Sequence, residues 1–242
     1  MKLISVELMA RDTFRGVERG DVMIVIDVLR CTSSIVTAMA NGAASIIPVR
    51  SVGQARAMKA KDRNYVLAGE RGGVPPRGFD LGNSPTDFST EEIRGKDIII
   101  TTTSGTQAIM NASEAKTVLI GSLLNLTSVA DEASKIAFGN GRSLTIALSG
   151  KKGTFSLEDF LCAGAIISKI GRKSRLSDAA SASLLAFKRA DENLAENILR
   201  GNHARELVDL GLEEDVILCS QKDKYDVVPI LSDGRIVRLE ST

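Results

Sequence analysis

The chain has 242 residues, of which 43% are hydrophobic, and its 31 Lys and Arg are balanced by 30 Asp and Glu. This composition is typical of a globular protein and excludes a disordered chain, and the length suffices for a large hydrophobic core. A formal net charge of +1 provides no broad basic surface, so we expect neither nucleic-acid binding nor attraction to an acidic membrane. Any anion that binds must be met by a local group of side chains.

The three cysteines, Cys31, Cys162 and Cys219, are widely separated and show no Cys-x-x-Cys spacing. They favour a reducing compartment and argue against a cysteine-based zinc site, and small buried residues are their simplest interpretation. No apolar run approaches the roughly 18 residues of a membrane span, and the N-terminal segment has no secretory pattern. We therefore expect a cytoplasmic protein.

Short apolar runs alternate along the chain with segments of helical period. After a short alternating stretch that ends near Met9, we predict strands at 22–26, 45–49, 65–68, 97–100, 117–120, 144–148, 216–219, 227–231 and 235–239. Between them we predict helices at 32–41, 51–61, 105–112, 126–138, 156–170, 178–189 and 193–210. The run at 22–26, VMIVI, is apolar on both faces, as expected for a central parallel strand covered by helices on both sides.

This alternation predicts an α/β fold of three layers, α/β/α, around a mainly parallel mixed sheet. The last two strands flank Asp233-Gly234, a step typical of a tight turn, so they should form a C-terminal antiparallel hairpin at an edge of the sheet. No linker or repeat divides the chain. We expect residues 1–242 to form one domain, with 175–242 as a helical and hairpin extension.

Polar residues follow most of the predicted parallel strands, where ligands bind in open α/β sheets. Asp27 and Arg30 follow the strand at 22–26, and Glu70 and Arg71 follow 65–68. The run Thr101, Thr102, Thr103, Ser104, Gly105 and Thr106 follows 97–100, Ser122 follows 117–120, and 149–153 follows 144–148. The long loop 69–85 adds Asp80, Asn83 and Ser84.

Together these residues favour a site for a small, multiply charged anion handled with a divalent metal ion. Carboxylate oxygens suit Mg²⁺, hydroxyls and backbone N–H groups at a helix start suit phosphate or sulfonate, and arginines can clamp an anion. Each group also has a purely structural interpretation. The hydroxyl run can simply cap a helix, Glu70 and Arg71 can form a local ion pair, and 69–85 can be a surface loop.

Other mechanisms lack their motifs. The chain has neither GxxxxGK[ST] nor a GxGxxG motif after a strand, and with one His and no GxSxG a Ser-His-Asp hydrolase is improbable. His203 lies in a polar helical segment, where we interpret it as a surface or cap residue. Glu158 and Asp159 open the helix at 156–170, and interaction with the helix dipole explains them nearly as well as metal binding does.

Five segments carry a resemblance to a known family. They are VIDVLRCTSSIVTA at 25–38, GERGG with GFDLGNSP within 69–85, TTTSGT at 101–106, GSLLN at 121–125 and LEDFLCAG at 157–164. In this order they resemble the 2-phosphosulfolactate phosphatase family of coenzyme M biosynthesis. Cys31 and Ser104 depart from the family pattern, which has Ala and Asn at these positions. The resemblance implies Mg²⁺-dependent hydrolysis of 2-phospho-3-sulfolactate to 3-sulfolactate and phosphate.

We therefore predict roles for the strand-end residues. The predicted catalytic residues are Asp27, Arg30, Glu70 and Asp80, and the predicted Mg²⁺ ligands are Asp27, Glu70 and Asp159. The predicted substrate-binding residues are Arg71, Asn83, Ser84, Thr101, Thr102, Thr103, Ser104, Gly105, Thr106, Ser122 and Asn125. Attack by metal-activated water is favoured over a phosphorylated carboxylate, although both stay open.

Two other functions remain as alternatives. One is a Mg²⁺-dependent phosphatase for another small phosphorylated hydroxy acid, and the other is a non-catalytic module that binds a small anion. The only partner expected in every case is a small anionic molecule. A homo-oligomer through Leu184, Leu185 and Phe187 stays open, with core packing as the simpler use of these side chains.

Overall fold

The structure, a computed structural model, describes residues 2–89, 91–171 and 174–240. Its strands are β1 Leu3–Glu7, β2 Val22–Ile26, β3 Ser45–Pro48, β4 Val66–Gly69, β5 Asp97–Thr101, β6 Val118–Gly121, β7 Leu144–Leu148, β8 Arg175–Leu176, β9 Pro229–Ser232 and β10 Arg235–Arg238. Its α-helices are α1 Phe14–Glu18, α2 Cys31–Ala40, α3 Val52–Lys61, α4 Gly105–Asn111, α5 Leu126–Gly139, α6 Leu157–Ile170, α7 Asp178–Ala190, α8 Leu194–Leu199, α9 Asn202–Asp209 and α10 Glu213–Cys219.

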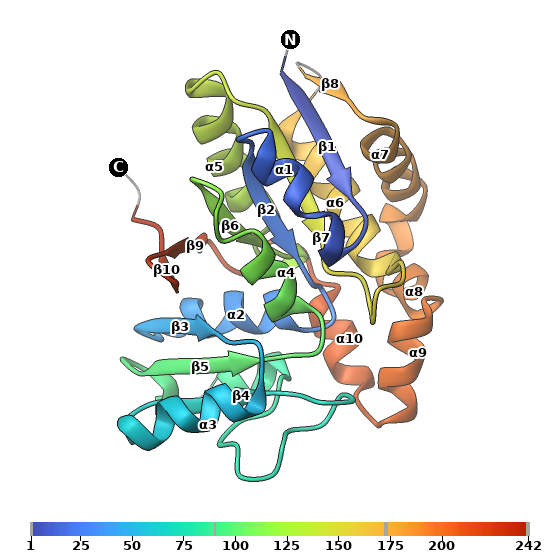
Figure 1. The fold of residues 1–242 in the computed structure, drawn as a ribbon. Coiled ribbons are helices and arrows are strands. Elements are labelled where there is room, and N and C mark those ends of the chain that lie inside the picture. The colour runs from blue at the N-terminus through green and yellow to red at the C-terminus, as the bar shows by residue number, and fades with distance from the viewer. Residues whose placement is uncertain (1, 90, 172–173, 241–242) are drawn as a thin grey trace.

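All ten strands belong to one mixed sheet, in the order β4-β5-β3-β10-β9-β6-β2-β7-β1-β8. The groups β4-β5-β3 and β6-β2-β7-β1-β8 are each parallel. Figure 1 shows β1, β2 and β7 descending through the upper half of the molecule while β3 and β5 cross its lower half, so the sheet twists strongly between the two groups. The mainly parallel, mixed α/β architecture predicted from the sequence is confirmed.

The C-terminal hairpin is not at an edge, as the sequence suggested, but in the middle of the sheet. Strand β10 pairs antiparallel with β3 through Ile236 and Ile46, and β9 pairs antiparallel with β6 through Ile230 and Leu119. The hairpin therefore joins the two parallel groups. A sequence pattern that predicts a hairpin does not reveal its neighbours, because pairing on either side satisfies the same alternation.

Strand β2 explains why both faces of the sheet are covered. Alternate residues point to opposite faces of a strand, and here Ile24 packs with the core under α5 and α6, whereas Val25 packs with the core under α2 and α4. All five residues of β2 are fully buried. A smaller core lies where α3 covers β3, β4 and β5. The apolar run VMIVI thus belongs to a central parallel strand, as predicted.

Two predicted elements near the C-terminus are wrong. Residues 216–219, predicted as a strand, form the last turn of helix α10. Its first turn carries Glu213, Glu214 and Asp215, acidic residues that favour a helix N-terminus. The predicted helix at 193–210 is divided into α8 and α9 because Gly201 has an extended backbone, with φ −67° and ψ 145°. Helix α1 and the two-residue strand β8 were not predicted from the sequence.

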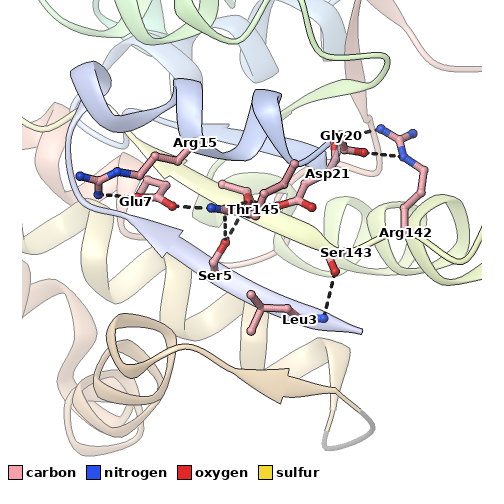
Figure 2. Close-up of polar contacts among 10 residues, drawn as sticks. Leu3, Ser5, Glu7, Arg15, Gly20, Asp21, Arg142, Ser143 and Thr145 are labelled. Atoms are coloured by element: carbon pink, nitrogen blue, oxygen red, sulfur yellow. Dashed lines mark hydrogen bonds and ion pairs between the residues drawn. The ribbon is translucent and has the colours of Figure 1, made fainter. Parts of the chain in front are cut away.

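A polar network holds α1 against the sheet at β1 and β7. The Arg19 guanidinium donates hydrogen bonds to Glu7, Asp21, Ser5 and Thr145 at 2.9–3.2 Å. Figure 2 shows Glu7, Ser5 and Thr145 drawn together by these contacts, with Asp21 beside them. Buried polar groups of this kind require partners, and this network supplies them. It accounts for the polar residues within otherwise apolar strands.

The proposed contact face on α7 mostly serves the core. Phe187 is buried and Leu184 packs against the core, whereas Leu185 is 68% exposed. None of the helices in the described part of the chain combines the length and the hydropathy required to span a bilayer.

Candidate active site

A cavity of about 130 Å³ opens where loops after β2, β4, β5 and β7 meet the helix α9. The two parallel groups of the sheet both contribute to it, as expected where the carboxyl ends of strands converge. The residues that line it are Asp27, Leu29, Arg30, Glu70, Gly72, Gly73, Asn83, Thr102, Thr103, Ser104, Gly150, Lys151, Lys152, His203, Glu206, Leu207 and Leu210.

Asp27 is the first residue after β2, and the Thr32 side chain fixes its backbone. Its N–H donates to Thr32 Oγ1 at 3.0 Å, and the Thr32 hydroxyl donates to the Asp27 carbonyl at 2.9 Å, which ties the turn to the start of α2. Gly105 allows the start of α4 to approach, because a Cβ there would collide with the Asp27 carboxylate and with Cys31. The carboxylate therefore sits in a closely packed corner of the cavity.

The Asp27 carboxyl group is strongly perturbed. Burial raises its pKa to about 6, the positive charge of His203 lowers it, and the negative charges of Glu70 and Glu158 raise it further. A neighbouring carboxylate and a desolvated position both disfavour the ionised form. A cation bound between Asp27 and Glu70 would relieve both effects.

Glu70 follows β4 and is fixed by two backbone donors. Gly73 N–H donates to Glu70 Oε2 at 2.9 Å, and Thr103 N–H donates to Oε1 at 2.6 Å. The first of these bonds closes a tight turn in which Gly72 and Gly73 both have positive φ, 64° and 87°, a conformation that favours glycine. Glu70 thus connects the loop after β4 to the loop after β5.

The hydroxyl run after β5 divides into structural and cavity residues. Thr102 and Thr106 exchange hydrogen bonds between backbone N–H groups and side-chain hydroxyls at 3.0–3.1 Å, which fixes the start of α4. Thr102, Thr103 and Ser104 line the cavity. Thr101 lies outside the lining and accepts a hydrogen bond from Arg71.

Arg30 lines the cavity, and its guanidinium forms an ion pair with a carboxylate. It donates to Asp215 Oδ2 on α10 and to the Gly73 carbonyl, both at 2.6 Å, and both partners of the ion pair are almost fully buried. Ser84 also donates to Asp215, and it lies behind the cavity wall rather than in it. Arg30 is therefore held rigidly, which suits the orientation of a bound anion.

Asn83 has an unsatisfied buried atom. Its side chain is 4% exposed and lines the cavity, and its Oδ1 accepts no hydrogen bond from the described residues. A buried carbonyl oxygen without a partner costs free energy, so such an atom points to a missing donor or cation.

A second tight turn lies in the loop after β7. Lys151 and Thr154 pair across it, and Lys152 has φ 49°, which is unusual for a residue with a side chain. Lys151 forms an ion pair with Glu206 on α9, whereas Lys152 has no ion-pair partner among the described residues. The Lys152 N–H also donates to Ser104 Oγ at 3.2 Å.

His203, on α9, contacts a buried carboxylate. Its Nδ1 lies 2.8 Å from Glu158 Oε1, and Glu158 is 1% exposed in the first turn of α6. The interpretation of His203 as a surface or cap residue is therefore wrong, since the ring lines the cavity. Glu158 likewise does more than interact with a helix dipole.

Several predicted site residues lie elsewhere. Asp80 is 43% exposed at its side chain and pairs with Lys59 and the Leu67 N–H, so it is outside the cavity. Ser122 and Asn125 bond to each other, and Asn125 also donates to the Ile120 and Val227 carbonyls, which fixes the chain after β6. These three are corrections to the predicted placement: a long loop and a helix cap supplied polar residues for local reasons.

Asp159 also braces the loops instead of facing the cavity. Its Oδ1 accepts from Val28 N–H at 2.8 Å, and its Oδ2 accepts from Ser149 and Gly150 at 3.1–3.2 Å. Burial, with the charges of Glu158 and Asp27, raises its pKa well above the usual range. Its predicted place among the metal ligands does not fit this position.

The cavity offers fewer metal ligands than predicted, but these still fit Mg²⁺. Throughout 2–89, 91–171 and 174–240, no group of three or more His, Cys, Asp or Glu side chains is arranged to hold a metal ion. Mg²⁺ needs only one or two carboxylates when substrate oxygens and water complete its shell. Asp27 and Glu70 would supply the carboxylates, and Asn83 Oδ1, which accepts no hydrogen bond from the described residues, would supply a neutral oxygen in the same cavity.

The residues missed by the sequence analysis share one helix face. His203, Glu206, Leu207 and Leu210 all line the cavity, and their spacing of three, four and seven residues places them on one side of α9. That spacing was visible in the sequence. The expectation that ligands meet loops after strands directed attention away from it.

Chemically, the cavity combines two carboxylates, one unpartnered amide oxygen, several cations and one imidazole. Cations and hydroxyls can bind an anion with more than one charged group, and the carboxylates can hold a divalent ion beside it. The imidazole can carry a proton.

Comparison with known proteins gives consistent results. The family model described as 2-phosphosulpholactate phosphatase matches residues 9–234. A protein of Pseudothermotoga lettingae is 40% identical over 92% of this chain and 94% of its own length, and one of Caldanaerobacter subterraneus subsp. tengcongensis is 39% identical over 96% and 97%. A third, from Carboxydothermus hydrogenoformans, is 41% identical over 89% of each chain. All three are named probable 2-phosphosulfolactate phosphatase.

Proposed function

Since the chain belongs to the 2-phosphosulfolactate phosphatase family, we propose that it is a phosphoric monoester hydrolase that converts 2-phospho-3-sulfolactate and water to 3-sulfolactate and inorganic phosphate. The proposal includes Mg²⁺ as cofactor and, by the family's implied pathway, a place in coenzyme M biosynthesis. The observation that carries it is the cavity that Asp27, Glu70 and the unpartnered Asn83 oxygen line together with Lys152, Arg30 and His203.

The charge of this substrate accounts for the composition of the cavity. Phosphate, sulfonate and carboxylate groups on one three-carbon acid require several separate cationic and hydroxyl donors within a small volume. Lys152 carries a charge that no described carboxylate pairs with, and Thr103 and Ser104 add hydroxyls beside it. Their arrangement supports a substrate with more than one anionic group.

Asp27, Glu70 and Asn83 would hold the metal ion. Mg²⁺ would supply charge neutralisation at a phosphoryl oxygen as the ester bond breaks. The chain's own residues orient the substrate: Arg30, fixed by Asp215, presents a rigid guanidinium, and the loops braced by Glu70 fix the cavity wall. Transfer of a phosphoryl group depends mainly on such positioning and charge stabilisation.

The test is phosphate release from two esters that differ only in the sulfonate. We expect release from 2-phospho-3-sulfolactate, at least about 10-fold slower release from 2-phospholactate because one anionic contact is lost, and no release in EDTA until Mg²⁺ is restored. Equal rates on the two esters would favour another phosphorylated hydroxy acid as substrate. Full activity in EDTA would refute the requirement for a metal ion. If no phosphate ester releases phosphate, the non-catalytic anion-binding module would be the remaining function.

A further inference from the structure

The contact between His203 and Glu158 is the feature of the cavity that the predicted site does not use. Glu158 is buried in the first turn of α6, and only one of its carboxylate oxygens has a partner among the described residues, the His203 Nδ1 at 2.8 Å. Burying a carboxylate is costly unless a hydrogen-bonded or charged partner compensates. The imidazole is that partner.

This contact sets the orientation of the ring. Nδ1 lies against the Glu158 carboxylate, which can only accept a hydrogen bond, so Nε2 is the ring nitrogen left for a ligand, and no described residue bonds to it. In the imidazolium form both ring nitrogens donate, so Nδ1 can bond to Glu158 while Nε2 presents an N–H donor in the cavity.

Other charged groups around the ring balance one another. Glu206, on the same helix face, is paired with Lys151, and Lys152 also lines the cavity. Asp27, in the loop after β2, lines the same cavity, and the charge of His203 lowers its pKa. Arg30 cannot release a proton, and Asp27 and Glu70 are needed for the cation, so His203 is the cavity group best suited to supply a proton.

The proposed reaction requires such a proton. When the ester P–O bond breaks, its electron pair moves onto the bridging oxygen, which would leave as a strongly basic alkoxide. We propose that His203 is the catalytic acid that delivers its Nε2 proton to this oxygen, and that Glu158 is a positioning residue that orients the ring. This inference rests on the proposed function, since it names the proton donor for that reaction.

The step balances. The bridging oxygen takes the proton and becomes the hydroxyl of the product, the phosphoryl group is transferred to water, and a proton lost from that water returns the neutral imidazole to its charged form. No oxidant, reductant or further reactant is required. General acid catalysis of this kind contributes about 100-fold to 10,000-fold to rate.

A bridging-sulfur analogue of the substrate provides the test. A thiolate is a much weaker base than an alkoxide and leaves without protonation, while the shape and charge of the ester stay nearly the same. The variant His203→Asn keeps an N–H donor for Glu158 and removes Nε2. We expect it to lower kcat on the oxygen ester by about 100-fold or more and kcat on the sulfur ester by less than about 5-fold.

Two further variants separate positioning from folding. Glu158→Gln keeps the hydrogen-bonding atoms but removes the charge, so we expect a smaller loss, about 10-fold, again confined to the oxygen ester. Glu196→Gln removes the same charge from an exposed pair with Arg200 on α8 and should leave both rates unchanged. Thermal melting of each variant reports whether the fold is retained.

The outcomes are distinct. Loss confined to the oxygen ester supports the inference. Equal losses on both esters in folded His203→Asn protein overturn it and point to a role in binding or in activating water. A wild-type protein that hydrolyses neither ester refutes the proposed function, and the inference falls with it. If His203→Asn fails to fold, Glu158→Gln decides by the same comparison of the two esters.

Discussion

Replacing Asp27 by Asn should stabilise the metal-free protein while abolishing its activity. Burial and the neighbouring carboxylates raise the pKa of Asp27 from 3.8 to about 6. A shift of about 2 units corresponds to about 3 kcal/mol of differential stability between the protonation states, at about 1.4 kcal/mol per unit. An amide of the same size has no such cost, so the variant should be more stable by about 3 kcal/mol at pH 7 and above.

The gain should depend on pH in a defined direction. Below about pH 4, Asp27 is protonated in both folded and unfolded chains, so the carboxyl group costs no stability and the variant gains nothing. Between pH 4 and 6 the unfolded chain ionises first, and the wild type loses stability relative to the variant. Above pH 6 both states are ionised and the difference is complete.

Urea denaturation at a series of pH values measures this difference. Asp80→Asn is a suitable control: burial, the largest single effect, raises the pKa of Asp80, but the hydrogen bonds from Lys59 and the Leu67 N–H together with the charge of Lys59 outweigh it, so the net pKa is lowered. That variant should lose stability at neutral pH. Asp27→Asn protein that is no more stable than wild type at pH 8, or a stability difference that does not change between pH 4 and 8, would refute the reasoning.

Adding Mg²⁺ extends the test. A ligand that binds only the folded protein raises its stability in proportion to the logarithm of its concentration over Kd. Mg²⁺ should therefore stabilise the wild type and leave Asp27→Asn nearly unchanged, so that the difference between them narrows. Equal stabilisation of both proteins would place the cation elsewhere.

Three further variants test the construction of the cavity. Gly105→Ala should lower stability by about 1–3 kcal/mol in urea denaturation and lower kcat, because its Cβ would collide with the Asp27 carboxylate; unchanged stability would contradict this packing. Asp215→Ala should cost about 3–5 kcal/mol in the same assay, because it leaves the buried charge of Arg30 unpaired; a cost under 1 kcal/mol would contradict the burial of the pair. Lys152→Gly should gain about 1 kcal/mol, because the backbone there has positive φ, while raising KM for the substrate; an unchanged KM would remove Lys152 from the binding site.

The positions of residues that directly follow parallel strands were predictable from the sequence. Asp27, Glu70 and Thr103 come from three different loops, and all three line one cavity because the carboxyl ends of their strands converge. Apolar runs located the strands that carry them, and those runs are readable in a single sequence. This part of the site therefore followed from local patterns.

The other wall of the cavity did not follow from such patterns. His203 and Glu206 reach it from α9, and Arg30 is held by Asp215 from α10, so these contacts depend on how the C-terminal helices pack. Tertiary packing of this kind leaves no short-range signal beyond an amphipathic helix face. For the same reason the sequence did not show that the C-terminal hairpin joins the two halves of the sheet.

Polar residues with local partners caused the opposite error. Asp80, Ser122 and Asn125 resemble site residues in composition and position. Their partners, however, are Lys59 and the Leu67 N–H for Asp80, and each other or the Ile120 and Val227 carbonyls for Ser122 and Asn125. Capping and turn formation use the same residue types as anion binding. Only the three-dimensional contacts distinguish the two uses.

The most direct test of the proposed site compares phosphate release from 2-phospho-3-sulfolactate by wild type, Asp27→Asn and Asp80→Asn in saturating Mg²⁺. The structure places Asp27 in the cavity and Asp80 outside it, although both follow strands of the same sheet. We predict that Asp27→Asn releases no phosphate above background and that Asp80→Asn retains at least half of the wild-type rate. An active Asp27→Asn enzyme, or an inactive but folded Asp80→Asn enzyme, would contradict the assignment of the reaction to this cavity.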